Sequence, residues 1–316
     1  MTITEESILI VGGRGLIGSA CVSKLNLLGY KNILAPSKSE LNCLNFESFS
    51  NFCKNNKVRN MIFAAGKVGG ILDNNNNQIN YMLENSFLAL NAIKVSLDCN
   101  LNKVVLFGSS CMYPVNANQP FNENDILNGQ LEKTSFGYAL SKILLTEGAC
   151  LSNKTMNEDT FFIPVIPNSC YGPNDNFDPK TSHVLSALIG KIINAKDNNK
   201  NFITLFGTGA PRREFIYSKD VADAVVFLMN NMKDKPISSI NIGSGDEISI
   251  LNLARKISEL VGYKGELKFD TKIPDGINRK ILDDTKLRNL GWKSSYNLEQ
   301  GLRETIDWYN NNKDLI

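Results

Sequence analysis

Apolar and polar positions alternate in blocks that predict strands and helices in turn through the first half of the chain. Short apolar runs, typical of strands buried on both faces, are followed by longer segments with helical spacing. The expected strands are 7–11, 32–35, 60–64, 104–107 and 160–166, and the expected helices are 16–28, 79–98 and 138–150. This order is typical of a doubly wound parallel sheet with helices on both faces. We therefore expect an α/β fold of the Rossmann type.

The pattern becomes looser after Pro167. A loop over 171–182 is rich in Pro, Gly, Asn and Asp, and a segment that covers a substrate would be expected there. Loops of this length are usually either functional or disordered. The later elements are expected to be helices from His183, from Lys219, at 250–261 and at 298–310, and strands at 202–206 and 239–242. The polar run 74–77 predicts a solvated turn ahead of the helix at 79–98.

These elements predict two lobes, and 316 residues are enough for one large or two modest domains. We expect residues 1–167 to form the Rossmann domain, with a returning strand near 238–245. Residues 168–237 and 246–316 would form a smaller C-terminal α/β lobe that binds the substrate.

A glycine-rich turn follows the first predicted strand and points to a nicotinamide dinucleotide. Gly12, Gly15 and Gly18 permit a tight turn, close approach of the backbone to a pyrophosphate, and packing of the next helix on the strand. Their spacing differs by one residue from Gly-x-Gly-x-x-Gly. A tight turn without a ligand is the alternative explanation of this motif alone.

Two cations favour NADPH over NADH. An acidic residue at the end of the second strand would bind the adenosine ribose, but the chain there reads Ala35, Pro36, Ser37, Lys38. Arg14 in the glycine turn and Lys38 are placed to hold a 2′-phosphate. The alternative is that both are ordinary surface charges.

Tyr138 and Lys142, with Ser109 upstream, predict a reductase. A lysine four residues after a tyrosine lies on the same helix face, so its ammonium can lower the pKa of the phenol from about 10. Such a tyrosine can give a proton to a carbonyl oxygen as hydride reaches the carbon. Tyr-x-x-x-Lys by itself occurs by chance in many helices, and the glycine turn supplies the context.

Composition narrows the class of protein further. The formal net charge is +2 and the charges are spread along the chain, which favours neither nucleic acid nor an anionic membrane as a partner. No apolar run approaches the roughly 20 residues that span a bilayer. The seven cysteines form no Cys-x-x-Cys pair, and we expect no signal peptide, so the chain reads as cytoplasmic, reduced and without a structural metal.

Taken together, the motifs resemble the extended short-chain dehydrogenase/reductases, and the phrases between them resemble the GDP-L-fucose synthase family nearly from end to end. The stretches that carry the resemblance are 12–19 (GGRGLIGS), 64–71 (AAGKVGGI), 108–114 (GSSCMYP), 171–177 (YGPNDNF), 211–217 (PRREFIY) and 274–283 (PDGINRKILD). The resemblance implies an enzyme that takes GDP-4-keto-6-deoxymannose, inverts carbons 3 and 5, and reduces carbon 4 with NADPH.

The same resemblance implies roles for individual residues. Ser109 would hydrogen-bond the keto oxygen, Tyr138 would protonate it, and Lys142 would bind the nicotinamide ribose. Cys111 and His183 match the family's acid/base pair for inversion, although a free cysteine is usually a small buried hydrophobe and a lone histidine is usually structural. His183 begins a helix, where the helix dipole would lower the pKa of the imidazole.

The family pattern also implies wider binding sets. Residues expected to bind the substrate are Ser110, Lys191, Phe206, Arg213 and Lys280, the cations for the diphosphate and Phe206 for the guanine, unless Phe206 is a core strand residue. Residues expected to bind NADP are Gly12, Gly13, Arg14, Gly15, Leu16, Ile17, Gly18, Lys38, Ala64, Ala65, Gly66, Tyr138, Lys142, Pro167, Ser169 and His183.

Departures from the family keep other functions open. The chain reads Asn168-Ser169 where relatives usually have Thr-Asn, and it has Asn174 and Lys191 where they often have histidine and arginine. A GDP-4-keto-6-deoxyheptose reduced at carbon 4 without epimerisation is therefore an alternative. An epimerase or dehydratase that retains NAD is a second, and a non-enzymatic NADPH sensor is a third.

A homodimer is also expected. The segments 79–98 and 138–150 carry apolar residues on more than one helix face, namely Leu83, Phe87, Leu88, Ile93, Leu140, Leu144 and Leu145. In the resembled family these two helices form a four-helix dimer interface, although burial within one chain would explain the pattern almost as well.

Overall fold

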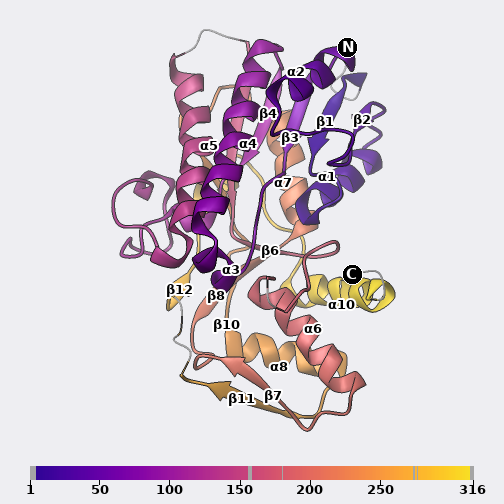
Figure 1. Cartoon of the computed structure of the whole chain (residues 1–316), viewed down its shortest axis with the longest axis vertical. Helices are drawn as coiled ribbons and strands as arrows, with labels where there is room; N and C mark the ends of the chain where they lie inside the picture. Colours follow the sequence, from indigo (N-terminus) through magenta and orange to yellow (C-terminus); the bar gives the residue numbers. More distant parts are fainter. Residues whose placement is uncertain (1–4, 156–158, 180, 273–274, 276, 314–316) are drawn as a thin grey trace.

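A computed structural model describes residues 5–155, 159–179, 181–272, 275 and 277–313, and it has two lobes (Figure 1). The larger lobe is built on a six-stranded sheet in the order β2-β1-β3-β4-β5-β9, with every neighbouring pair parallel. Its strands are β1 (Ile8–Val11), β2 (Ile33–Leu34), β3 (Asn60–Phe63), β4 (Lys103–Phe107), β5 (Phe161–Pro167) and β9 (Ile240–Ile242). The predicted doubly wound α/β fold is confirmed.

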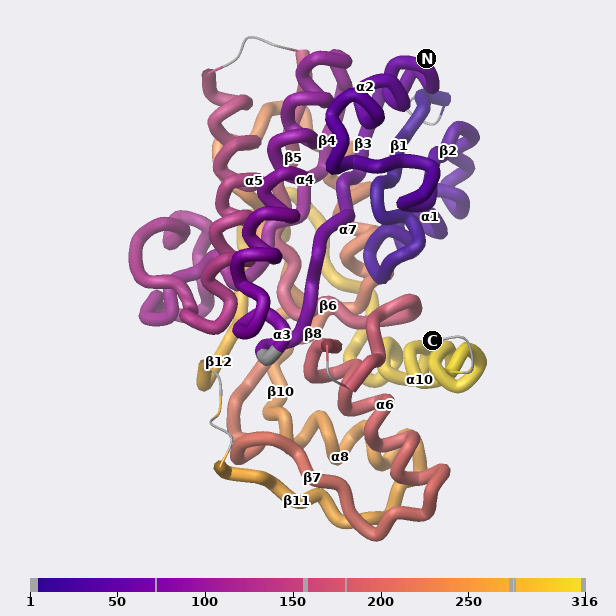
Figure 2. The backbone as a smooth tube through the Cα atoms, in the orientation of Figure 1, coloured from indigo at the N-terminus to yellow at the C-terminus, as the bar shows by residue number. Residues whose placement is uncertain are grey.

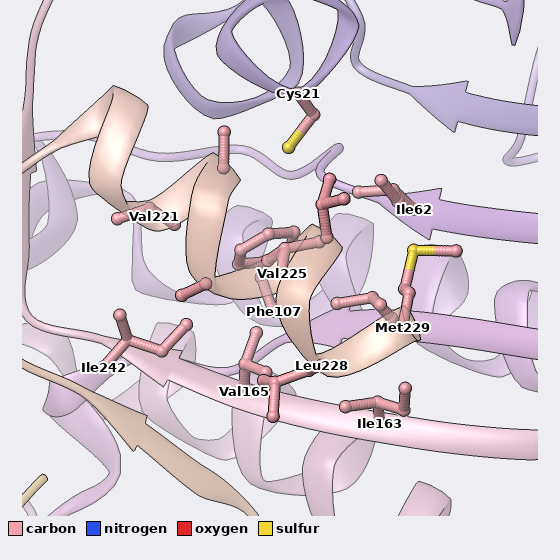
Figure 3. Packing of buried hydrophobic residues seen from close by; sticks show 14 of the residues in the cluster. Cys21, Ile62, Phe107, Ile163, Val165, Val221, Val225, Leu228, Met229 and Ile242 are labelled. Carbon is pink, nitrogen blue, oxygen red and sulfur yellow. The ribbon is translucent and has the colours of Figure 1, made fainter. Parts of the chain in front are cut away.

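Helices cover both faces of this sheet, because successive strand residues point to opposite sides. Ile8 and Ile10 of β1 pack towards α1 (Leu16–Leu27) and α7 (Ser218–Asn231), and Figure 3 shows Val221, Val225 and Met229 of α7 over the strands. Leu9 and Val11 belong to the core on the other face, beneath α2 (Phe46–Asn55), α4 (Gln78–Asp98) and α5 (Phe136–Thr155).

The smaller lobe contains two further sheets. Strand β8 (Arg212–Tyr217) lies at the centre of one, paired with β6 (Ser169–Tyr171), β10 (Glu247–Ser249) and β12 (Arg279–Lys280). The other pairs β7 (Phe202–Phe206) with β11 (Glu266–Asp270), and its helices are α6 (Val184–Asp197), α8 (Ile250–Val261) and α10 (Leu298–Asn312). The beginning of the chain lies in the larger lobe and its end in the smaller one (Figure 2).

Helix α7 crosses the predicted lobe boundary. It belongs in sequence to the segment 168–237, yet it packs against α1 and the six-stranded sheet. Helix α9 (Thr285–Asn289) likewise lies beside β9.

One predicted turn is wrong. Residues 74–77 were expected to form a solvated turn, but helix α3 (Ile71–Asn76) includes most of them, and Asn74 is buried. Its amide donates to the Gly69 carbonyl at 2.6 Å and to the Gly70 carbonyl at 3.1 Å. The polar side chain is therefore used inside the fold to satisfy backbone oxygens.

Within the described ranges, no helix is long and apolar enough to cross a membrane.

Candidate active site

The fold brings Ser109, Tyr138 and Lys142 together. Ser109 follows the carboxyl end of β4, and Tyr138 and Lys142 lie one turn apart at the start of α5. The Ser109 hydroxyl is hydrogen-bonded to the Tyr138 phenol, and Lys142 Nζ donates to the Phe107 carbonyl at 2.8 Å. Tyr138 and Lys142 are both buried. Carboxyl ends of parallel strands are where ligands bind in open α/β sheets.

The pKa of Tyr138 is shifted in the opposite direction to the one expected from the sequence. Burial raises the pKa of Tyr138 above its ordinary value, Cys111 and Tyr81 raise it further, and the bond from Ser109 opposes them. Lys142 lies 5.8 Å from the centre of the Tyr138 ring. The expected lowering of the phenol pKa is therefore reversed, since the loss of solvation outweighs the hydrogen bond from Ser109. Burial also lowers the pKa of Lys142 to about 8.

The glycine turn forms a cradle that leaves no room for a side chain at Gly12 or Gly18. A methyl group on Gly18 would lie 2.1 Å from the Gly12 carbonyl oxygen, and one on Gly12 would lie 3.0 Å from Ala64. Gly12 also has a φ of +81°, which favours glycine. Helix α1 begins directly after this turn, with no side-chain cap and no acid in its first turn. Its free N–H groups and dipole fit the pyrophosphate of a dinucleotide.

Residues 64–66 continue this cradle towards Lys142. A methyl group on Gly66 would lie 3.6 Å from Lys142 Nζ and 3.2 Å from Asn85 Oδ1. The buried Asn85 accepts from the Lys67 N–H at 2.8 Å and donates to the Lys67 carbonyl at 3.0 Å. Asn85 thus fixes the segment after β3, a role that sequence reasoning missed because one asparagine in an amphipathic helix carries no motif.

Arg14 and Lys38, the two cations expected to hold a 2′-phosphate, extend into solvent. Their side chains are 77% and 84% exposed, and each has only a long ion pair of 3.9 Å, to Glu40 and Glu84. Glu40 is an acid near the end of β2 that the sequence reasoning missed. It accepts from the Ser37 hydroxyl and N–H, and these bonds lower its pKa, with a smaller contribution from Arg14.

Cys111 lies between Tyr138 and two cations of the smaller lobe, Lys280 and Arg213. Lys280 Nζ lies 3.6 Å from Cys111 Sγ, and the pairing of β12 with β8 sets Lys280 directly beside Arg213. Burial lowers the pKa of Arg213, and Cys111 is among the nearby groups that oppose this. The predicted thiol lies near Tyr138, and two of the predicted substrate cations lie near this thiol.

His183 faces the same group. It is the N-cap of α6, and its pKa is lowered first by burial and then by the charge of Lys280. His183 is exposed to solvent, although many protein atoms surround its imidazole. The Gly70 N–H donates to the Thr181 carbonyl at 2.7 Å, so the 64–71 stretch holds the segment just ahead of His183.

Lys191 and Phe206 form a separate pair on α6 and β7. Lys191 Nζ lies 5.4 Å from the Phe206 ring and donates to the Thr204 carbonyl. Phe206 is exposed and not in the core. Lys191 lines a groove of about 630 Å³ with several asparagines of α6 and the turn that follows it.

The remaining residues predicted to bind substrate or cofactor can be placed by their secondary structure and burial. Ser110 is buried in the short helix after Ser109, Pro167 ends β5, and Ser169 begins β6. Pro274 and Gly276, from the stretch 274–283, lie outside the described residues. In the part of the chain that the structure describes, no group of three His, Cys, Asp or Glu residues could hold a metal ion.

The fold and this site define a short-chain dehydrogenase/reductase. The model of the NAD dependent epimerase/dehydratase family matches residues 8–243. GDP-L-fucose synthase 1 of Arabidopsis thaliana is 38% identical over 98% of this chain and 94% of its own. The chain belongs to the NAD dependent epimerase/dehydratase family and, within it, to the GDP-L-fucose synthases.

Two solved structures are similar over nearly the whole chain. MlghC, a GDP-mannoheptose C4 reductase from Campylobacter jejuni with NADP bound, is 30% identical with a TM-score of 0.88, covering 98% of this chain and all of its own. A GDP-L-fucose synthetase from Naegleria fowleri bound to NADP is 25% identical with a TM-score of 0.91, covering 100% and 97%. The family resemblance expected from the sequence is confirmed.

Proposed function

We propose that this protein is an NADPH-dependent reductase of a GDP-linked 4-keto-6-deoxy sugar, and that it inverts carbons 3 and 5 before it reduces carbon 4. The observation that supports this most is the position of Cys111, which lies beside Tyr138 and is contacted by Lys280. A site for reduction and a candidate acid/base pair thus share one space. Its similarity to GDP-L-fucose synthases and to a GDP-heptose reductase supports the same substrate class.

In the reduction, Ser109 and Tyr138 hold the keto oxygen. NADPH, when bound in the glycine cradle, supplies hydride to carbon 4. The raised pKa of Tyr138 keeps its phenol protonated at neutral pH, so it can give a proton to the oxygen. Lys142, whose pKa is about 8, is mostly cationic at pH 7 and can stabilise the phenolate that remains.

For the inversion, Cys111 and His183 exchange protons with carbons 3 and 5. Protons on these carbons are acidified by the neighbouring ketone, and inversion requires removal from one face and return to the other. The lowered pKa of His183 keeps its imidazole neutral near pH 7, the form that can accept a proton. Arg213 and Lys280 would bind the diphosphate, Ser110 would contact the sugar, and Lys191 with Phe206 would bind the guanine end.

The cofactor is proposed to bind as NADPH through Arg14 and Lys38. Both cations are exposed and lack a close ion pair, so they are available to a 2′-phosphate. Lys142 would bind the nicotinamide ribose with Tyr138 beside it, and the lobe of residues 1–167 with β9 would carry the rest of the cofactor site. We place the enzyme in the cytoplasm, since all seven cysteines are free thiols.

The test is turnover by the purified protein. We expect NADPH oxidation with GDP-4-keto-6-deoxymannose, and kcat/KM at least about tenfold lower with NADH because charge-assisted bonds to the 2′-phosphate are lost. The 4-keto-6-deoxyheptose counterpart is the paired substrate. Preference for the heptose without ring inversion would favour the second candidate, a dedicated heptose C4 reductase, which the similarity to MlghC supports. No oxidation of NADPH with either sugar would contradict the proposal.

A homodimer through α4 and α5 is proposed as the assembly. Ile79, Leu83 and Phe87 form an exposed apolar stripe along α4, and Leu144 and Leu151 are exposed on the adjacent α5. Leu88 and Leu145, also counted in the predicted interface, are instead buried in this chain's own core. An apolar stripe on two packed helices is the surface from which a four-helix interface is built.

Phe87→Glu is expected to convert the dimer to a monomer, because it places two charges at the centre of a two-fold interface. Sedimentation equilibrium at micromolar concentration measures this. Leu27→Glu, at an exposed leucine of α1, is the matched control and should remain a dimer. A wild-type protein that is monomeric under these conditions would rule out the assembly.

A further inference from the structure

The buried carboxylate of Glu214 lies at the junction of the two lobes. Glu214 is in β8, the central strand of the sheet in the smaller lobe, and its exposed fraction is 0%. A buried carboxylate without a cation beside it needs several hydrogen bonds to be tolerated.

Four donors surround this carboxylate. Oε1 accepts from the N–H groups of Ser244 and Gly245, both at 2.8 Å. Oε2 accepts from the Leu282 N–H at 3.0 Å and from the Asn168 side-chain amide. A methyl group on Gly243 would lie 2.6 Å from Oε1, so this glycine leaves the space that the carboxylate fills.

The donors come from the segments where the chain passes from one lobe to the other. Asn168 connects β5 of the larger lobe to β6 of the smaller one. Ser244 and Gly245 connect β9 to β10, and Leu282 lies between β12 and α9. Strand β8 itself continues directly into α7, which packs on the larger lobe. The Glu214 side chain therefore forms hydrogen bonds with three of the segments that connect the two lobes. The strand that carries it, β8, leads into the fourth connection.

The residues next to these contacts belong to the proposed site. Arg213 precedes Glu214, so alternation along the strand turns it to the opposite face, towards Cys111. Lys280 lies two residues before Leu282 and pairs with Arg213. Ser169 follows Asn168, whose Oδ1 accepts the Ser169 N–H at 3.0 Å.

We propose that Glu214 is a positioning residue that holds Arg213 and Lys280 of the smaller lobe in place relative to Ser109 and Tyr138 of the larger one. This inference rests on the proposed function, because it assumes that those cations bind the GDP moiety. Burial raises the pKa of Glu214 and the four donors lower it, so the carboxylate depends on keeping all of them.

The test is Glu214→Gln, which keeps the shape of the side chain but replaces one accepting oxygen with an NH₂ group. That group would face N–H donors and could not accept their hydrogen bonds. We expect the Kd of GDP, measured by calorimetry, and the KM of the sugar nucleotide to rise at least about tenfold, as loss of buried charge-assisted bonds would shift the cations. The Kd of NADPH should change by less than about threefold, because most of the expected NADPH contacts, including the glycine cradle, lie in the larger lobe and only Ser169 is linked to Glu214, through Asn168. A merely structural role would weaken both ligands together.

Glu123→Gln is the matched control. Glu123 is another buried carboxylate that accepts a backbone N–H, that of Asn241 at 2.9 Å, and it lies in the short helix Glu123–Asp125 and not in the strand that holds Arg213. Its substitution should leave the Kd of GDP within about twofold. If Glu214→Gln does not fold, Asn168→Ala removes one of the four bonds and should still weaken GDP binding about threefold.

The outcomes separate the two proposals. A wild-type protein that binds no GDP would overturn the proposed function and this inference with it. A wild type that binds GDP, together with an unchanged Kd in Glu214→Gln, or in Asn168→Ala where that variant is needed, would overturn the inference alone. Equal loss of GDP and NADPH affinity would also overturn it.

Discussion

Replacing Tyr138 with phenylalanine is expected to lower kcat for NADPH oxidation by about 10²- to 10⁴-fold, the usual contribution of a positioned general acid. The phenol is the acidic group hydrogen-bonded to Ser109 in the space beside Lys142, and burial keeps it protonated. Removing one oxygen leaves the ring and its packing in place. NADPH affinity, measured by fluorescence titration, should fall by less than about threefold, because the phenol is one expected cofactor contact among many and the glycine cradle is untouched.

Tyr30→Phe provides the control for Tyr138→Phe. Tyr30 is also a buried tyrosine, and its hydroxyl donates to Asn230 at 2.9 Å on the α1 side of the sheet. Its loss should leave kcat within about twofold. If Tyr138→Phe kept more than about a tenth of wild-type kcat, another group would have to deliver the proton, and the assignment of Tyr138 would be wrong.

The second large effect concerns Cys111. Cys111→Ala should reduce deuterium exchange from D₂O into carbons 3 and 5 of the keto sugar by about 10²- to 10⁴-fold, because one member of the acid/base pair is gone. Reduction at carbon 4 should continue, since Ser109, Tyr138 and Lys142 remain. Exchange is followed by NMR without NADPH, and reduction by NADPH absorbance.

Cys99→Ser is the matched control for Cys111. Cys99 is likewise a half-buried free cysteine, but it lies at the end of α4 beside Ser50, and its loss should change neither activity. His183→Asn should reproduce the loss of exchange. Equal loss of exchange and reduction in Cys111→Ala would indicate a shared positioning role and would contradict the division of labour.

Much of the fold could be predicted because parallel strands leave a strong apolar signal. The expected strand at 202–206 and the helix at 250–261 have the predicted bounds, and others differ by a few residues. Helix α2 was missed, although its buried residues Phe49, Ser50 and Cys53 recur with helical spacing. Strand β8 was missed because Arg212, Arg213 and Glu214 hide its pattern. The hydrogen bonds of buried Asn74 to the Gly69 and Gly70 carbonyls could not be predicted either, because such contacts produce no periodic pattern of apolar residues in the sequence.

The candidate site was predictable where chemistry and spacing coincide. Tyr138, Lys142 and Ser109 lie together as their motif indicates, and Cys111 lies beside them. The direction of the Tyr138 pKa was not predictable, because burial depends on the whole fold and not on the distance to one lysine. Glu214 escaped notice for the same reason, since its four donors come from segments far apart in sequence.

The most direct test of the central claim is NMR of the sugar product formed from GDP-4-keto-6-deoxymannose and NADPH in D₂O. If one pocket both inverts and reduces, the product is GDP-L-fucose with deuterium at carbons 3 and 5 and protium from NADPH at carbon 4. A reduced product that retains the original configuration and carries no deuterium at those carbons would contradict the account.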